Sequence, residues 1–264
     1  IFARTWAHLP PSPQQPLATG EFWAAAIHAV RTRYPDFAFV AEAYWELEGR
    51  LQRLGFDFTY DKALYDRLLH GDAAAIRAHL GADLEYQARS VRFVENHDEP
   101  RIAHELEPAR RAAALVIAMT VPGMRFVHDG QVEGRRVRTS VHLGKRVPEA
   151  VEPGALAIHA TLFEVLRLPA LRQGAFRVLA GSGSVIAHRW EHPHGSVVVA
   201  VNYSGDEAFA QFPVELHGIE GRSVMLQDRM SSVEYARDGT ELVDPARGLF
   251  VKLAPWQAHV FVVR

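Results

Sequence analysis

The chain has 264 residues, enough for one large domain or two smaller ones, and its 48% hydrophobic and 23% charged residues are an ordinary globular balance. A formal net charge of −2 excludes the surplus of Lys and Arg that nucleic-acid-binding proteins need, and the absence of Cys excludes disulfides, thiolate metal sites and a Cys nucleophile. No apolar run approaches the roughly 20 residues that span a bilayer, so we expect no membrane insertion.

Residues 1–6 contain neither an initiator Met nor the basic and apolar regions of a signal peptide. We therefore expect the chain to begin inside a domain. With no localisation signal in view the compartment stays open, with the cytoplasm favoured.

Predicted helices and strands alternate from residue 19 to residue 168. The apolar spacing predicts helices at about 20–33, 47–54, 61–69, 72–88, 108–120 and 154–167. Short apolar runs predict strands at 37–41, 56–60, 91–95 and 124–128. The run at 37–41 has no polar alternation, which is typical of a strand buried on both faces. The alternation implies a parallel sheet with helical crossovers.

The pattern changes near residue 174, where short β-rich runs separated by turns begin. Strands are predicted at 176–180, 185–190, 197–202, 222–226, 249–253 and 259–263. They predict a small antiparallel β-sandwich. We place the boundary at residue 170, which gives two domains, 1–170 and 171–264.

The first candidate site is the segment after the strand at 37–41. Glu42 follows it directly and would be partly desolvated at the mouth of the sheet, which suits a general acid. Tyr44 and Trp45 would offer flat apolar faces to a sugar ring. In the alternative interpretation, Glu42 caps the next helix and the aromatic residues belong to the core.

The second candidate is the dense polar segment that follows the strand at 91–95. It reads Glu-Asn-His-Asp-Glu-Pro-Arg from Glu95 to Arg101. The alternative is a solvated turn in which Asp98 pairs with Arg101. A third segment, residues 122–134, contains a turn at Asp129-Gly130 and is only weak evidence for a functional site by itself.

Taken in this order, these segments resemble the α-amylase family, glycoside hydrolase family thirteen. The strand before Glu42 looks like the fifth barrel strand, whose Glu is the general acid/base. The segment with His97 and Asp98 looks like the seventh-strand motif, in which both residues hold the sugar and the Asp stabilises the transition state. Residues 122–134 look like the eighth strand and its exit loop, and residues 253–261 look like the close of the C-terminal β domain.

The resemblance therefore implies the second half of a TIM (β/α)8 barrel followed by an antiparallel β-sandwich. It implies catalytic roles for Glu42 and Asp98, and substrate contacts from His97, Tyr44, Trp45 and Arg101. The family's nucleophile is an Asp in a Gly-x-Arg-x-Asp setting, which this sequence lacks. Residues 1–6 look like the segment just downstream of that strand, so the nucleophile would lie upstream of Ile1.

These implications define the expected function. The intact parent would be a retaining α-glycosidase acting on an α-glucan or oligosaccharide, while this chain alone would be inactive and would need the N-terminal half of the barrel as its partner. Without that half, we expect exposed apolar surface. A transglycosylase or isomerase of the same family, and an inactive carbohydrate-binding relative, stay open as alternatives. No cofactor or metal ligand is predicted here, because the family's calcium site draws mainly on upstream segments.

Overall fold

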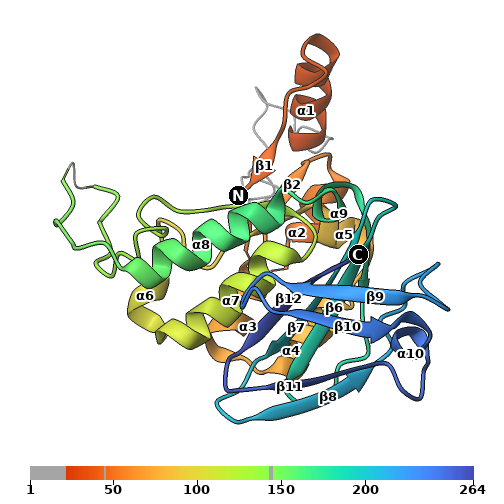
Figure 1. Ribbon diagram of the computed structural model, residues 1–264. Coiled ribbons are helices and arrows are strands. Elements are labelled where there is room, and N and C mark those ends of the chain that lie inside the picture. Colours follow the sequence, from red (N-terminus) through yellow and green to blue (C-terminus); the bar gives the residue numbers. More distant parts are fainter. Residues whose placement is uncertain (1–21, 45, 143–144) are drawn as a thin grey trace, which may run out of the picture. The chain divides into compact units, whose positions relative to one another are not determined.

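The computed structural model describes residues 22–44, 46–142 and 145–264, and Figure 1 labels their helices and strands. The chain falls into two compact units. The first comprises the described part of Ile1–Lys62 together with Ala82–Arg92 and Pro122–Met124. The second comprises Ala63–Gly81, Phe93–Val121 and the described part of Arg125–Arg264. The proposed domains 1–170 and 171–264 stay a prediction.

The first unit is built on a short parallel sheet. Its strands are β1 (Val40–Ala41), β2 (Phe58–Tyr60) and β3 (Ser90–Arg92), and β4 (Met124–Arg125) completes the order β1-β2-β3-β4. The pairs β1–β2 and β2–β3 are parallel, so the parallel pairing predicted for the first three strands is confirmed, although each strand is shorter than expected. The helices of this unit are α1 (Phe22–Arg33), α2 (Glu48–Arg53) and α5 (Leu84–Ala88).

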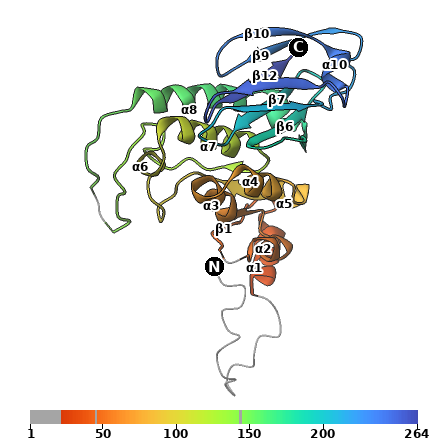
Figure 2. The ribbon, with the colours of Figure 1, turned by 90° about the horizontal axis from the view of Figure 1, so that it is seen from below.

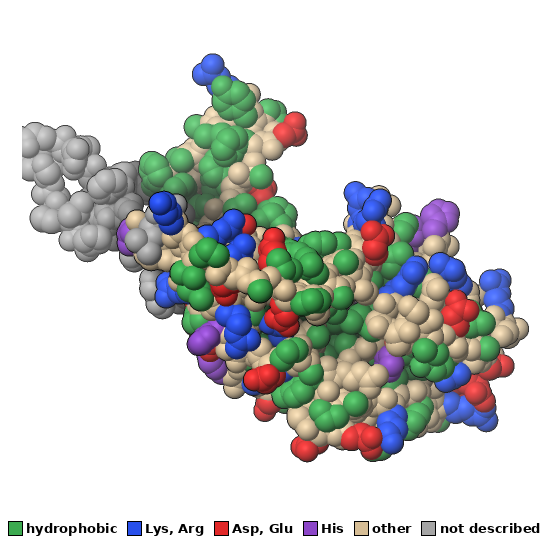
Figure 3. All heavy atoms as spheres, turned by 60° about the vertical axis from the view of Figure 1, so that its left-hand side comes forward, with side chains coloured by type: hydrophobic (Ala, Val, Ile, Leu, Met, Phe, Trp, Pro, Cys, Tyr) green, Lys and Arg blue, Asp and Glu red, His purple; other side chains and the backbone are tan. Residues whose placement is uncertain are grey.

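The prediction that residues 37–41 are buried on both faces is wrong. Ala41 is fully buried, but the side chains of Phe37 and Val40 are 52% and 43% exposed. The physical reason is that β1 lies at the edge of the sheet, where only β2 pairs with it among the described strands. Phe22 of α1 is also exposed, and Figure 3 shows hydrophobic side chains gathered around this region at the top of the view.

A buried polar cluster lies at the end of β3. The Arg92 guanidinium donates to the Pro122 carbonyl at 2.7 Å and forms an ion pair with Asp61. Gly123 closes this corner with φ 121°, and a Cβ there would come within 2.2 Å of the Ser90 carbonyl oxygen. Because Asp61 and Arg92 are both almost fully buried and paired, Asp61 is part of the interior of this unit.

The second unit contains most of the helices. They are α3 (Lys62–His70), α4 (Ala73–Leu80), α6 (Ile102–Glu105), α7 (Pro108–Thr120), α8 (Pro153–Leu166), α9 (Pro169–Gln173) and α10 (Gly239–Val243). In Figures 1 and 2, α7 and α8 lie side by side. No helix in the described part of the chain has both the length and the hydrophobicity that crossing a lipid bilayer would require.

The prediction of a single helix over residues 72–88 is wrong. The chain forms α4 and α5 instead, separated at Gly81. Asp83 begins the second of them, because its carboxylate accepts hydrogen bonds from the backbone N–H groups of Glu85 and Tyr86 at 2.9 and 3.2 Å. An Asp in this role stabilises a new helix start more than it would stabilise a helix interior.

Two antiparallel sheets form the rest of the second unit. The larger has the order β10-β9-β12-β7-β6-β5, and the smaller pairs β11 with β8. Their bounds are β5 (Ala175–Val178), β6 (Val185–Glu191), β7 (Ser196–Asn202), β8 (Ala208–Phe212), β9 (Ser223–Asp228), β10 (Glu234–Asp238), β11 (Leu249–Leu253) and β12 (Ala258–Val263). The six predicted strands are confirmed with shifts of one or two residues at their ends, whereas β8 and β10 were missed.

The two antiparallel sheets share one hydrophobic core. Alternate residues point inward, including Val198 and Ala200 of β7, Phe212 of β8 and Val251 of β11, each 4% exposed or less. Along β8, β9 and β11 buried and more exposed residues alternate, which is the period-2 pattern of strands with one buried face, whereas β6, β7 and β12 are buried on both faces. Figure 2 shows these strands gathered in one region with α7 and α8 beside them.

A buried histidine joins α7 to the larger sheet. The Thr120 hydroxyl donates to the Val116 carbonyl at 2.6 Å, so it accepts from Nε2–H of His188 at 2.9 Å. Trp190 of the same strand donates from its indole N–H to the Thr120 carbonyl. Complete burial lowers the pKa of His188 from 6.5 to about 3, since the charged imidazole would lose its hydration.

This histidine is expected to make the protein acid-sensitive. The unfolded chain takes up a proton near pH 6.5 while folded His188 stays neutral to about pH 3, so stability falls as pH drops through this window, by up to ~1.4 kcal/mol per pH unit. Urea unfolding from pH 7 to pH 4 measures this slope. His188→Gln keeps a donor without titrating and should show a shallower slope; equal slopes in both proteins would contradict the assignment.

Candidate functional site

Within the first unit, the candidate residues follow the edge strand β1. Glu42 comes directly after β1 and is half-buried, and the Tyr44 hydroxyl donates a hydrogen bond to its Oε1 at 3.1 Å. The alternative in which Glu42 caps the next helix is not observed, because the residue at the N-cap of α2 is Leu47 and it makes no side-chain capping bond. Trp45 lies outside the described residues.

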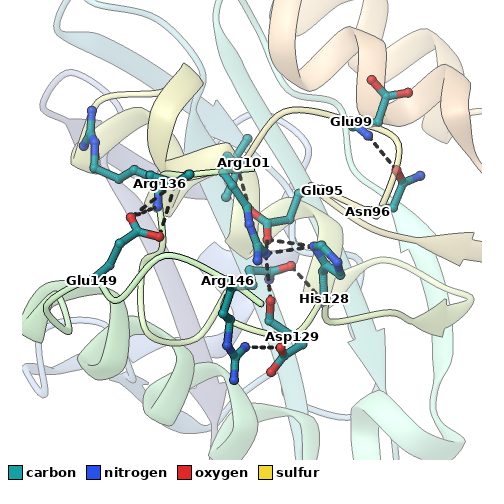
Figure 4. Close-up of polar contacts among 12 residues, drawn as sticks. Glu95, Asn96, Glu99, Arg101, His128, Asp129, Arg136, Arg146 and Glu149 are labelled. Atoms are coloured by element: carbon teal, nitrogen blue, oxygen red, sulfur yellow. Dashed lines mark hydrogen bonds and ion pairs between the residues drawn. The ribbon is translucent and has the colours of Figure 1, made fainter. Parts of the chain in front are cut away.

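In the second unit, a turn organised by Asn96 follows β3. Its Oδ1 accepts the backbone N–H groups of Asp98 and Glu99 at 2.9 and 3.0 Å, which reverses the chain (Figure 4). Asn96 is fully buried, while the side chains of His97 and Asp98 are 41% and 52% exposed. His97 Nε2 lies 3.4 Å from Asp98 Oδ2. The turn thus presents the two predicted sugar-binding groups together at the surface of this unit.

The base of this turn is held by a buried ion pair. Glu95 is fully buried, and its Oε1 accepts from Arg101 Nη1 at 2.6 Å while Oε2 accepts the backbone N–H of Ile102 at 2.8 Å. Arg101 Nη1 also donates to the Asp129 carbonyl at 2.8 Å. The alternative pairing of Asp98 with Arg101 is therefore not observed, since Glu95 takes the guanidinium instead.

His128, at the exit of β4, completes this cluster. Its Nδ1 lies 2.8 Å from Arg101 Nη1 and 3.3 Å from Glu95 Oε1. His128 Nδ1 therefore lies within hydrogen-bonding distance of both members of the buried ion pair. Figure 4 shows Arg101 enclosed by Glu95, His128 and the Asp129 backbone.

An open pocket of about 330 Å³ lies over this cluster within the second unit. His97, Arg101 and His128 form one side of it, and residues of the long loop after β4 form the other. A neighbouring pocket of about 400 Å³ is lined by Asp98 and by the same loop. The loop residues that line the two pockets are Asp129, Arg138, Thr139, Ser140, Val141, His142, Lys145 and Arg146.

Apart from Asp129, which lies in the candidate segment 122–134, these loop residues were not predicted to belong to the site. Two contacts fix the ends of the loop: Arg146 forms an ion pair with Asp129, and Glu149 accepts the backbone N–H of Arg136 at 2.7 Å. The usable signal in the sequence was the high density of Arg, Lys and His at residues 135–146, which begins seven residues after the predicted strand at 124–128. Segment 122–134, which was weak evidence for a site by itself, leads into the loop that forms one wall of the two pockets.

No protein-family model matches the chain, and no curated protein matches it by sequence. Solved structures do match. A noncanonic maltogenic α-amylase from Thermotoga neapolitana superposes with a TM-score of 0.74 at 17% identity, over 91% of this chain and 59% of that one. An α-amylase from Geobacillus thermoleovorans, solved with acarbose, gives a TM-score of 0.72 at 17% identity, over 92% and 57%. The fold is that of the α-amylases.

A third structure extends the comparison to another named activity. Cyclic α-maltosyl-(1→6)-maltose hydrolase from Arthrobacter globiformis matches with a TM-score of 0.63 at 18% identity, over 91% of this chain and 52% of that enzyme. The chain thus spans between half and three-fifths of the length of these relatives. The resemblance to the α-amylase family is confirmed in the fold, including the expectation that the chain corresponds to only part of such an enzyme.

Proposed function

We propose that this chain is the C-terminal half of a retaining enzyme that acts on α-glucans. In this proposal β1 to β4 are the fifth to eighth strands of a (β/α)8 barrel, and the antiparallel sheets form the C-terminal sandwich. The observation that carries the proposal is the position of the two motifs in a chain that shares the α-amylase fold over 91% of its length. Glu42 directly follows β1, the His97-Asp98 turn comes a few residues after β3, and both strands belong to one parallel sheet.

The proposed chemistry is a double displacement. Glu42 donates a proton to the glycosidic oxygen as the bond to the anomeric carbon breaks and a carboxylate attacks that carbon. Glu42 then takes a proton from water, whose oxygen displaces the carboxylate and restores the original configuration. We propose that the attacking carboxylate comes from a segment outside these 264 residues, the N-terminal half of the barrel.

The remaining residues position the substrate in this proposal. Asp98 and His97 hold ring hydroxyls and stabilise the positive charge that develops on the sugar. Tyr44 orients Glu42 through its hydroxyl, and Trp45 offers a flat face to a sugar ring. Arg101 contributes to binding as a wall of the pocket and as the anchor of the turn. We assign no calcium ligand to this chain.

The test compares the 264-residue chain with a longer protein that carries it behind an upstream Gly-x-Arg-x-Asp strand. With maltooligosaccharides, the longer protein should release reducing sugar with retained configuration by NMR, and the chain alone should show none above its own Glu42→Gln variant. Turnover by the chain alone that disappears in Glu42→Gln would disprove the proposed division of catalytic groups. A longer protein that inverts configuration would disprove the mechanism.

A further inference from the structure

Two phenylalanines stand exposed on the outer face of the small sheet. Along β8 and β11 the residues Ala210, Phe212, Leu249, Val251 and Leu253 point into the shared core. The alternate positions therefore point outward, and there Phe209 and Phe250 are 53% and 57% exposed. Figure 1 shows the two strands side by side at the lower edge of the picture.

The two rings form a flat apolar ledge. In the antiparallel register Phe209 pairs with Lys252 and Phe250 with Gln211, so the rings are diagonal neighbours. Their centroids lie 6.3 Å apart and their planes are within 27° of parallel. We call this pair, Phe209 and Phe250, the ring ledge.

Polar groups surround the ring ledge. Lys252 Nζ lies 5.4 Å from the Phe209 ring centre and 3.1 Å from a carboxylate oxygen of Glu207. Gln211 stands on the same face and donates to the Arg247 carbonyl. An apolar strip two rings long, bordered by an ammonium, a carboxylate and an amide, combines one apolar surface with several hydrogen-bonding groups.

The ledge is too small for a stable protein interface. Burying one Phe side chain completely removes ~150–250 Å² of its surface from water. The two half-exposed rings together therefore offer about the surface area of one fully exposed Phe side chain. Stable interfaces bury ~800 Å² on each partner. The surrounding Glu207 and Lys252 are exposed and already paired, which disfavours burial under a second protein.

We propose that the ring ledge binds a chain of α-linked glucose, as a site separate from the turn at residues 95–101. The choice of glucan rests on the proposed function. A pyranose ring presents C–H groups on its faces and hydroxyls at its rim. The faces would cover Phe209 and Phe250 and leave water, while the rim hydroxyls would exchange hydrogen bonds with Lys252 and Glu207.

Affinity electrophoresis tests the proposal directly. The 264-residue chain is run in native gels with and without amylopectin, and it should be retarded by the polysaccharide. Phe209→Leu together with Phe250→Leu keeps two apolar side chains but removes both flat faces, and should weaken binding by roughly tenfold or more. Phe209→Tyr with Phe250→Tyr keeps the faces and should retain retardation. Phe163→Ala is the control, because Phe163 is 38% exposed on α8 of the same unit.

Three results would overturn the proposal that the ring ledge binds glucan. They are no retardation of the unsubstituted chain, equal retardation of the double Leu variant, and gel filtration showing a dimer that the Leu variant loses while amylopectin binding is unchanged. Circular dichroism confirms that each variant is folded. Glu42→Gln should leave retardation intact. If the longer protein does not turn over glucan but the retardation still depends on the two rings, only the proposed enzymatic function is disproved. If the longer protein turns over glucan but the retardation does not depend on the rings, only the proposed binding site at the ring ledge is disproved.

Discussion

Replacing Glu95 by Ala is expected to lower the free energy of unfolding by ~3–5 kcal/mol, a large fraction of the stability of a typical domain. Glu95 and Arg101 are almost completely buried, and the substitution leaves the guanidinium charged without its carboxylate. The same change removes the acceptor of the Ile102 backbone N–H, 2.8 Å away, which would also be left buried. The turn that carries His97 and Asp98 should lose its anchor at the same time.

A double-mutant cycle separates the ion pair from the other contacts. Arg101→Met is measured alone and with Glu95→Leu by urea unfolding. The double variant should be more stable than the sum of the two single losses predicts, because a paired apolar replacement leaves no buried charge behind. Additive losses, or a Glu95→Ala protein within ~1 kcal/mol of the original, would show that water or another group replaces the pairing.

In the longer protein that we propose, replacing Glu42 by Gln is expected to lower kcat by ~10²–10⁴-fold, since positioned general acids contribute that much. The loss should depend on the leaving group. Maltooligosaccharides need a proton on the departing oxygen, whereas an activated aryl glycoside departs without one, so formation of the covalent intermediate should be much less impaired with the aryl substrate. Steady-state rates with both substrates, and the burst of aryl release, measure the difference.

The matched control for this experiment is Glu46→Gln. Glu46 is an exposed carboxylate four residues further on, so its loss should leave kcat within about twofold of the original. Azide gives an independent check, because with Glu42→Ala it can attack the intermediate without a base and should yield the α-glycosyl azide. Equal losses for both substrates, with no azide product, would remove the general acid/base role from Glu42.

The sequence was most informative where buried strands meet polar segments. The parallel pairing of β1, β2 and β3 followed from the strand–helix alternation. Glu42 and Asp98 were singled out because each follows a predicted strand, and their catalytic roles stay a prediction. The partner of Arg101 could not be found in this way. Spacing favoured Asp98, three residues away, but the Asn96 turn directs Asp98 outward and leaves the buried Glu95 to take the guanidinium.

Contacts between distant parts of the sequence account for most of what was missed. His128 reaches Arg101 because β4 ends beside the turn, and 27 residues separate the two in sequence. The exposure of Val40 depends on β1 being an edge strand, which the apolar run could not indicate because a run of this kind also fits a central strand. Strand β8 carries the alternation of a half-buried strand, in the sequence Ala-Phe-Ala-Gln-Phe, and could have been predicted.

The interleaving of the two compact units also constrains synthesis of the chain. The first unit takes segments from before Lys62, from Ala82–Arg92 and from Pro122–Met124, and the second unit fills the intervals. The first unit cannot be completed until Met124 has left the ribosome, and the second cannot be completed until β12 has, so early segments must wait for partners made several seconds later, at ~5–20 residues per second. Because such long-range closures slow folding, the nascent chain carries unpaired strand edges while it waits, and such edges are prone to aggregation.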